Sequence, residues 1–519
     1  MSSFDTRTRL NLLKPFPSSA PSSKRNAFDK LRQAGAYGAS LLALSACSLT
    51  PPYQRPAPPI PVSWPVGDAY LRQSEATLPA VSYRDIFRDV RLQQLVEEAL
   101  INNRDLALAA ANIAAAREQF RIQRAEILPN IDANGTYTES DRGNGAGGGI
   151  GQAASGRFTN YRLQAGLTAF ELDLFGRIRA LTEAERNRYF ATEAGARATR
   201  LVLVGDIANA WATYGADQEL LAIAERTVAS AERSVRLTRA RLTGGVAPRT
   251  DLRQAEQTLE QARVDAAQAR TALVQDVNLL QLLVGAPVDP VLLPETLAQV
   301  EPTVSELPAG LDSTILLRRP DVVQAEYELR AANAQIGAAR AALFPRISLT
   351  GVLGLASTTL GSLFSGDAFN WSVGPTASYS IFQGGAARAN VRFTEAQQEA
   401  AVAQYERAIQ TAFREVSDAL AVRGTIGEQL RAQRAFNVAA EDNFNLSEAR
   451  FRGGIDPFLQ TLIAQRSLYG AQRQLVTTRL ARVQNLVQLY RSLGGDSQLD
   501  ATRRGPLPVG KVSRPSGLR

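Results

Sequence analysis

Long intervals without proline constrain this chain of 519 residues more than any other feature of its sequence. Proline breaks a helix interior because it has no backbone N–H and its ring clashes with the preceding turn. No proline occurs between Pro129 and Pro248, or between Pro375 and Pro457. These stretches predict helices over 176–243 and 385–452, each about 100 Å long at a rise of about 1.5 Å per residue.

Apolar residues along the first of these helices recur with a period of seven. They are Ile207, Tyr214, Leu221, Val228, Val235 and Leu242. A seven-residue period produces a left-handed supercoil with a partner helix. The same spacing continues over 249–284 and 458–493, so the sequence predicts coiled-coil helices arranged as two hairpins.

One phrase occurs twice at the expected hairpin turns: "RLTGGVAPRTDL" begins at Arg241 and "RFRGGIDPFLQT" begins at Arg450. A Gly-Gly pair can supply the left-handed conformation that ends a helix, and proline is favoured near the start of the next one. We therefore expect two equivalent hairpin tips. Their residues are Gly244, Gly245, Pro248, Gly453, Gly454 and Pro457.

The duplication extends beyond the tips. The segment "RDLALAAANIAAAREQFRIQRAEILPNI" from Arg104 matches "PDVVQAEYELRAANAQIGAARAALFPRI" from Pro320. The sequence therefore predicts two repeats, 91–301 and 302–499, each containing a helix, two strands, a long helix, a tip and a shorter helix. The helix that opens the second repeat is expected over 320–343.

Four segments alternate between apolar and polar residues. They cover about 129–141, 158–173, 345–357 and 369–381. In the second segment, the odd positions from Tyr161 to Ala169 are apolar and the even positions are mostly polar. A half-buried soluble sheet shows the same pattern, but four such strands with Tyr and Trp near their ends favour the wall of a membrane barrel. Because about eight strands are the fewest that close a barrel, several chains must contribute.

The amino-terminal region has the layout of a secretory signal: basic residues, a short apolar run and a small-residue site. It ends in Leu-Ser-Ala-Cys at Cys47, which resembles the lipidation site of bacterial lipoproteins. We expect a signal peptide over 1–46, lipid on Cys47 and a lipid-anchored, proline-rich linker over 47–90. Ser48 favours sorting to the outer membrane. The basic segment 500–519 is expected to be a disordered tail.

Composition excludes several classes of protein. The chain has no His and a single Cys, so Ser-His-Asp triads, Cys-His pairs and Cys/His zinc sites cannot be built. We expect no catalytic, cofactor-binding or metal-binding residues. The net charge of +8 is concentrated at the two ends of the chain, so it does not indicate a nucleic-acid partner.

The chain resembles the TolC-like outer-membrane efflux channels, specifically the lipoprotein (NodT/OprM-like) subfamily of tripartite RND efflux systems. The motifs "FELDLFGRIRA", "YSIFQGGAARANV" and "FREVSDALA" carry this resemblance together with the two tip phrases. It implies an α+β membrane protein in which a homotrimer builds a 12-stranded β-barrel, four strands per chain. This barrel would be continuous with a long α-helical coiled-coil tunnel in the periplasm.

The resemblance also implies partners and site residues. The expected protein is a passive exit channel in outer-membrane lipid, joined through a periplasmic adaptor to an inner-membrane RND-type pump. The tips would be the adaptor-docking sites. Asp456, Leu459 and Arg466 are the candidates for a constriction of the channel. The sequence departs from the family at Ile463, where many members carry an acidic residue.

Two other interpretations stay open at this point. A TolC-like exit duct for type I protein secretion would share every motif, and the lipidation site favours the small-molecule branch over it. A lipid-anchored periplasmic coiled-coil scaffold would explain the seven-residue period but not the alternating strands. Drugs or other small molecules are the expected cargo, and the channel sequence leaves their identity open.

Overall fold

The structure is a computed structural model that describes residues 48–61, 82–142, 156–303 and 313–509. The expected signal peptide 1–46, the expected lipidation site Cys47 and the segment 510–519 lie outside these described residues.

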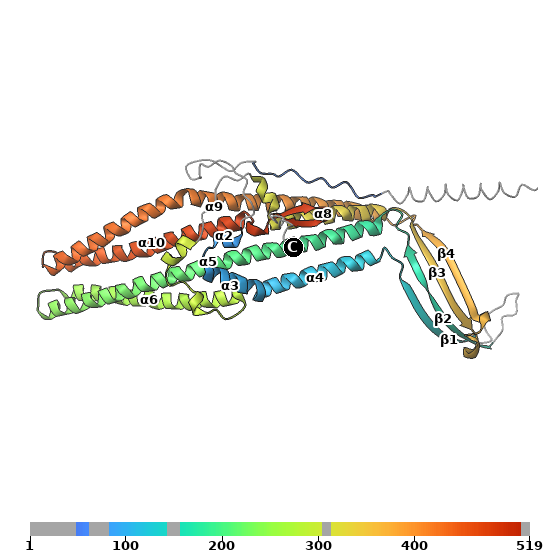
Figure 1. Cartoon of the computed structure of the whole chain (residues 1–519), viewed down its shortest axis with the longest axis horizontal. Coiled ribbons are helices and arrows are strands. Elements are labelled where there is room, and N and C mark those ends of the chain that lie inside the picture. The colour runs from blue at the N-terminus through green and yellow to red at the C-terminus, as the bar shows by residue number, and fades with distance from the viewer. Residues whose placement is uncertain (1–47, 62–81, 143–155, 304–312, 510–519) are drawn as a thin grey trace, which may run out of the picture.

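Four long helices run along one axis of an elongated molecule (Figure 1). The first hairpin consists of α5 (Arg177–Thr243) and α6 (Arg249–Val284), and the second of α9 (Ala386–Arg452) and α10 (Phe458–Ser492). α5 and α9 have 67 residues each, which corresponds to about 100 Å of helix. Both hairpin tips lie at the end of the molecule opposite to the sheet.

One antiparallel sheet occupies the other end of the molecule (Figure 1). Its strands are β1 (Ile131–Arg142), β2 (Gly156–Glu171), β3 (Arg346–Ser357) and β4 (Phe369–Ser378), in that order across the sheet. The two repeats meet in the middle of the sheet, where β2 pairs with β3. β1 and β4 are its edges, so the sheet does not close within one chain.

Shorter helices lead from the body of the molecule to the strands. α4 (Arg104–Ala125) precedes β1, and α8 (Pro320–Ala341) precedes β3. α2 (Tyr83–Ile86) and α3 (Val90–Asn102) come before α4. The remaining helical segments are η1 (Pro290–Leu292), α7 (Leu297–Val300), η2 (Glu301–Thr303), η3 (Ser313–Arg318), η4 (Leu360–Ser362), η5 (Gly366–Ala368) and η6 (Gly495–Ser497). Among the described residues, no helix combines the length and apolarity needed to cross a membrane.

The main core joins helices from both repeats. Trp211, Tyr405 and Tyr490 are its largest buried side chains, on α5, α9 and α10 respectively. The indole Nε1 of Trp211 donates a hydrogen bond of 2.9 Å to the carbonyl of Leu292. Because burying an aromatic side chain removes a large apolar area from water, this core holds the two hairpins together between their tips and the sheet.

The segment expected to be a linker over 47–90 is only partly a linker. Its described end forms α2, in which Ser82 makes a reciprocal capping box with Asp85. Tyr83, Ile86 and Phe87 are buried in the main core. The expectation was wrong there because the proline-rich composition ends at Pro65, and the apolar residues near the end of the segment pack into the core.

The expectation of a disordered tail over 500–519 is also wrong for its first part. β5 (Leu499–Thr502) and β6 (Gly505–Pro508) form a hairpin. The hydroxyl of Tyr327 donates to the carbonyl of Thr502 and accepts from its backbone N–H, both at 2.9 Å. Leu499 is buried with Tyr327 and Phe190, so a tertiary contact with α5 and α8 orders this basic segment.

Replacing the buried Leu499 with Ala is expected to lower the free energy of unfolding by about 2–5 kcal/mol, because a buried Leu leaves a cavity when truncated. The melting temperature of the purified protein measures this loss. Leu507→Ala in the same hairpin is the control, because Leu507 is 55% exposed and surface substitutions change stability by about 0.5 kcal/mol at most. Equal melting temperatures for the two variants would contradict the packing role of the hairpin.

Candidate functional site

The strand register collects the apolar residues on one face of the sheet. Ala133 lies opposite Ala165, Ala165 opposite Leu353, and Leu353 opposite Trp371. The next row along the strands carries polar or small residues: Asn134, Gln164, Gly354 and Asn370. Side chains alternate between the faces of a strand, so one face of the sheet is apolar and the other is polar.

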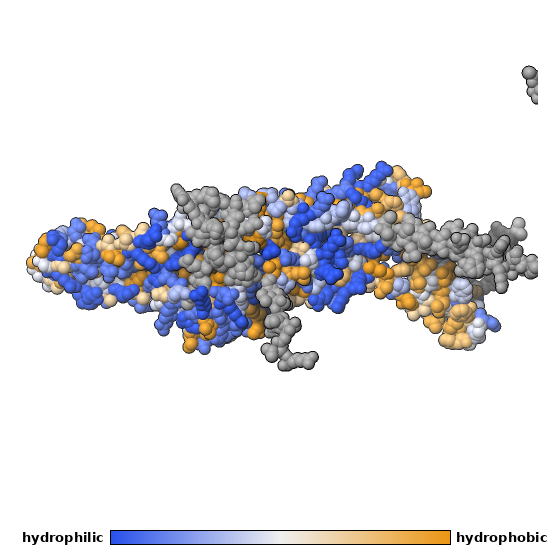
Figure 2. Space-filling model, turned by 45° about the horizontal axis from the view of Figure 1, so that its top comes forward, coloured by the Kyte–Doolittle hydropathy of each residue, from blue (hydrophilic) through white to orange (hydrophobic). Residues whose placement is uncertain are grey.

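The apolar face is not covered by any described part of the chain. Ile131 is 72% exposed, Trp371 70% and Val373 64%. Figure 2 shows the sheet end as an orange and pale surface beside the bluer helical body. Large contiguous apolar patches on a protein surface mark interaction sites or contact with a membrane. This face therefore requires an apolar environment.

A β-bulge interrupts the alternation in β2. Leu167 pairs with Gly351, but the next paired residue is Phe170, opposite Leu349. Ala169 lies between them with a φ of 54°, the one positive φ of a non-glycine residue in the described chain. The expectation that Ala169 continues the apolar row was therefore wrong, because the extra residue of the bulge moves Phe170 onto the apolar face.

Both hairpin tips have the same backbone geometry. After α5, the N–H of Val246 donates to the carbonyl of Arg241 at 2.9 Å, and Gly245 donates to Leu242 at 3.0 Å. The second tip repeats these two bonds from Ile455 and Gly454. This pattern is the Schellman motif, which needs one left-handed residue after the helix.

Only the second glycine of each pair supplies that conformation. Gly245 has a φ of +71° and Gly454 a φ of +72°, whereas Gly244 and Gly453 have φ values of −76° and −74°. Each pair therefore provides the left-handed cap conformation through its second glycine. Two further tip residues, Pro248 and Pro457, are the N-caps of α6 and α10.

The two tips contact each other within the chain. The Arg241 guanidinium lies 4.6 Å from the centre of the Phe451 ring and donates to the Phe451 carbonyl at 3.3 Å. Phe451 and Phe458 pack in a small apolar cluster with residues of α5 and α6. The cluster therefore links the ends of both hairpins.

The structure does not bring the three constriction candidates together into one contact. Asp456 accepts two hydrogen bonds from Arg450, at 2.6 and 3.0 Å, and this guanidinium lowers the pKa of Asp456. Leu459 and Arg466 lie on an exposed stripe of α10 together with Ile463. These three residues share a helix face because they are separated by four and three positions.

Polar contacts between α6 and α10 were missed by the sequence analysis. The hydroxyl of Tyr469 donates to Asp265 at 2.7 Å, and Arg473 lies 3.7 Å from the same carboxylate. Burial and the Asp265 carboxylate raise the pKa of Tyr469. Tyr469 belongs to the seven-residue apolar pattern of α10, which was interpreted as packing alone. Its hydroxyl was the signal that could have suggested a polar contact.

A second missed contact joins α10 to α5 and η2. Arg479 lies 2.6 Å from Glu219 and 3.1 Å from Glu301, and all three side chains are largely buried. Removing one partner of such a group leaves uncompensated charge in a place of low dielectric. Together with the Tyr469 contact, this ion pair connects the second hairpin to the first.

Two carboxylates face each other between α5 and α6. Burial and the neighbouring Asp217 raise the pKa of Asp276 to about 7, and burial also raises the pKa of Asp217. The stabilisation from the protonated pair is complete below the pKa of about 4 of an unfolded Asp. It is lost as the pH rises through about 7.

No group of acidic, His or Cys side chains within the described residues could hold a metal ion. The geometry instead offers an uncovered apolar sheet face, a polar opposite face and two exposed hairpin tips about 100 Å of helix away. This arrangement suits a membrane-embedded wall with a long extension.

Comparisons with known proteins agree with this geometry. The sequence pattern of the family described as "Outer membrane efflux protein" matches residues 95–286 and 311–495. The antibiotic efflux pump outer membrane protein ArpC and the toluene efflux pump outer membrane protein TtgC, both of Pseudomonas putida, are each 43% identical over 455 residues. That alignment covers 87% of this chain and 93% of each relative.

Solved structures give the same result. The open state of the MtrE outer membrane channel of Neisseria gonorrhoeae superposes with a TM-score of 0.75 at 31% identity, covering 88% of this chain and 100% of that one. A CusC structure superposes with a TM-score of 0.77 at 35% identity, covering 86% and 100%.

The geometry of the tips predicts different tolerances for two adjacent glycines. Gly454→Ala is expected to destabilise the second tip by about 1–2 kcal/mol, because a Cβ is disfavoured in the left-handed conformation. Gly453→Ala is the matched control, since its φ is negative and a Cβ there would make ordinary contacts with the Ala449 and Arg450 carbonyls. Hydrogen exchange of the Ile455 amide measures the difference. Equal exchange in both variants would contradict the assigned turn.

Proposed function

The chain belongs to the outer membrane efflux protein family, and on that premise we propose that three copies form one channel that works with an adaptor and an inner-membrane pump. The protein is the outer-membrane channel component of an efflux pump, with a large helical extension into the periplasm. Membership of this family makes the protein a transporter. The trimer, the adaptor, the RND-type pump and the lipid on Cys47 belong to the proposal.

The observation that carries assembly from several copies is the register of the sheet. Four paired strands present one uncovered apolar face and end in two unpaired edges. Inside lipid, each unpaired backbone group costs several kcal/mol, so open edges are not tolerated. Three copies supply twelve strands and leave no edge. The polar face then lines a water-filled lumen through which substrates pass without energy input from the channel itself.

The helical ends support a gate at the tips. We place the constriction on the exposed stripe of α10 that contains Leu459 and Arg466, with Asp456 held beside it by Arg450. Opening requires the second hairpin to move relative to the first. The contact between Tyr469 and Asp265 opposes that movement because it joins α10 to α6.

The exposed tips support adaptor docking. Val246 and Ile455 are 69% and 66% exposed at the two tips, and a trimer would present six such knobs. Coiled-coil hairpins of an adaptor fit this surface by helix packing. For cargo, the relatives named for antibiotics and toluene favour drugs or other small organic molecules.

Efflux in cells that carry a matched adaptor and pump tests the proposed function. Gly454→Val is expected to form trimers in mild detergent and to lose most efflux, because a β-branched residue distorts the left-handed tip far from the sheet. Gly361→Val is the control at the sheet end, where a Cβ meets no other atom within 4 Å. Equal efflux from the two variants would show that the adaptor does not dock at the tips. Light scattering that found only monomers would contradict the trimer.

The gate can be tested separately in planar lipid bilayers. Tyr469→Phe removes one hydrogen bond worth about 1 kcal/mol, so the closed-to-open equilibrium is expected to shift roughly fivefold towards the open state. Tyr214→Phe is the matched control, because within the described part of the chain the Tyr214 hydroxyl bonds to Gln218 on its own helix. An unchanged open probability in Tyr469→Phe would show that this contact does not restrain the gate.

A further inference from the structure

The junction between the two repeats within one chain shows how neighbouring repeats pack at the helical end of the sheet. At that end of the β2–β3 pair, Glu171 lies opposite Ser348. Just beyond it, the ring of Phe344, which precedes β3, stacks on the ring of Phe175, which follows β2, with the ring centres 4.7 Å apart. The helix-to-strand connection of the second repeat thus packs on the strand-to-helix connection of the first.

The first repeat carries counterparts of the packed residues at the outer edge of the sheet. In the two matching segments of the sequence, Leu128 corresponds to Phe344, and Asp132 corresponds to Ser348. Leu128 is 69% exposed. Within the described residues, the Asp132 carboxylate accepts one hydrogen bond, at 3.4 Å from Asn130. Both side chains therefore lack the partners that their counterparts have at the inner junction.

The strand-to-helix connection of the second repeat is equally uncovered. In both repeats this connection ends in a left-handed glycine that caps the long helix. Aligned on that glycine, Ser380 corresponds to Glu171, and Phe382 corresponds to Asp173, whose carboxylate accepts from the first N–H groups of α5. Phe382 is 88% exposed and its neighbour Ile381 is 92% exposed. An exposed aromatic ring thus replaces a capping carboxylate.

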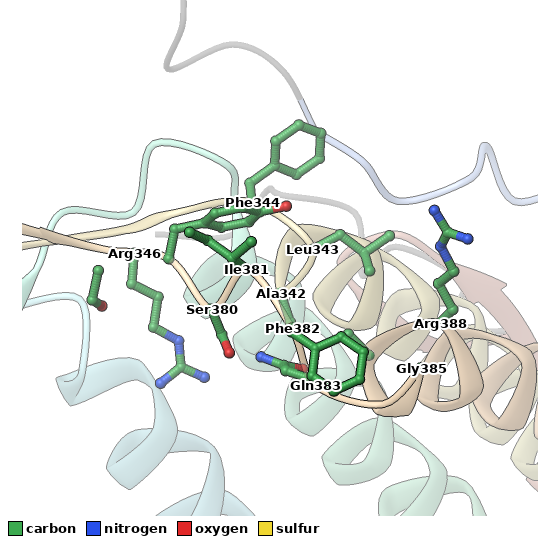
Figure 3. Close-up of a pocket in the computed structure, with 13 residues that line it drawn as sticks. Ala342, Leu343, Phe344, Arg346, Ser380, Ile381, Phe382, Gln383, Gly385 and Arg388 are labelled. Atoms are coloured by element: carbon green, nitrogen blue, oxygen red, sulfur yellow. The ribbon is translucent and has the colours of Figure 1, made fainter.

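A cavity of about 760 Å³ opens at this connection, between the end of α8 and the loop from β4 to α9 (Figure 3). Its lining is mixed: Ile381 and Phe382 are apolar, whereas Arg346 and Ser380 are polar. Figure 3 shows the side chains of Arg346 and Ser380 pointing to the same side of the loop. The occupant of this cavity must therefore offer both an apolar group and a partner for a cation.

Arg346 is a cation without a carboxylate partner in the described part of its own chain. Two carboxylates, Glu171 and Asp173, line a small pocket together with Arg346. Each of them pairs with another residue, Glu171 with Arg177 at 2.8 Å and Asp173 with Arg179 at 3.2 Å. The polar face of the sheet near β4 thus presents an unpaired positive charge.

We propose that this cavity is a socket for the α4–β1 connection of a neighbouring copy of the chain, an inference that rests on the proposed closed trimer. Asp132 of the neighbouring copy lies opposite Ser380 and pairs with Arg346. Leu128 of the neighbouring copy packs on Phe382. The contact between copies then repeats the contact between repeats, with the carboxylate on the opposite strand.

The placement of the two connections supports this occupant. The α4–β1 and β4–α9 connections lie at the same end of the sheet, on its two open edges (Figure 1), so closure of a ring brings them together. Two strand spacings of about 4.8 Å separate β3 from the β1 of the neighbouring copy. An extended Arg346 and the Asp132 of that copy span this gap, and the ion pair compensates two charges that lack partners in the single chain.

Disulfide crosslinking in the full-length protein tests the socket. Leu128→Cys is combined with Phe382→Cys, and outer membranes are oxidised. Within one chain these positions lie at opposite edges of the sheet, about 14 Å apart over three strand spacings, whereas the Cα atoms of a disulfide lie within about 7 Å. We expect covalent trimers on a non-reducing gel that disappear with reductant. Each single-cysteine variant is the control and is expected to give none.

Charge reversal tests the ion pair. Asp132→Arg is expected to lower the temperature at which the trimer dissociates in detergent, because it places two guanidinium groups side by side. Adding Arg346→Asp is expected to restore most of this loss. Asp367→Arg is the control at the far end of the sheet, in η5, and is expected to leave the temperature unchanged. No recovery in the double variant overturns the ion pair.

The outcomes separate the socket from the trimer. Trimers by light scattering without the disulfide overturn the socket and leave the trimer intact, whereas only monomers overturn both. A second cysteine pair, Leu128→Cys with Ile381→Cys, guards against poor disulfide geometry at one position. Covalent trimers from neither pair, or from a single-cysteine variant as often as from the pairs, overturn the site.

Discussion

Backbone hydrogen bonding in lipid is the constraint on which the rest of this structure depends. The sheet has an uncovered apolar face and two open edges, and hydrocarbon offers nothing that could pair with the edge N–H and C=O groups. A single chain would therefore leave unpaired backbone groups in the membrane. The requirement for closure links the sheet to its neighbours, and the continuous helices that follow β2 and β4 extend the resulting ring into a tunnel.

The internal repeat gives each chain two similar units, each with two strands and a helical hairpin. The positions at which the two repeats differ are the ones where their chemistry differs. Both tips use the same hydrogen bonds and the same left-handed glycine. The second tip alone has the Arg450–Asp456 ion pair, which lies beside the exposed stripe of α10. The junction from strand to helix has a capping carboxylate in the first repeat and an exposed aromatic ring in the second. Duplicated folds can thus keep their packing while single positions acquire separate chemistry.

α8 connects both ends of the chain to the body. Arg330 pairs with the buried Glu326, stacks on the ring of Tyr53 in the amino-terminal segment Ser48–Pro61, and donates to the carbonyl of Thr502 in the terminal hairpin. These contacts join segments more than 400 residues apart in the sequence. Contacts of this kind order both terminal segments together, because the two segments share Arg330 as a charged partner.

The sequence by itself determined the features that are written in short-range patterns: the long helices, the alternating strands, the two tips and the repeat. These patterns are local, because helix and strand periods act over a few residues and proline excludes a helix wherever it occurs. Only the tertiary structure decided the bulge at Ala169, the contact of Arg55 with Glu326, the ordered hairpin after Leu499 and the contact between Tyr469 and Asp265. Each of these depends on a partner that is distant in sequence, and a residue's own neighbours along the chain carry no information about which distant group will be brought beside it.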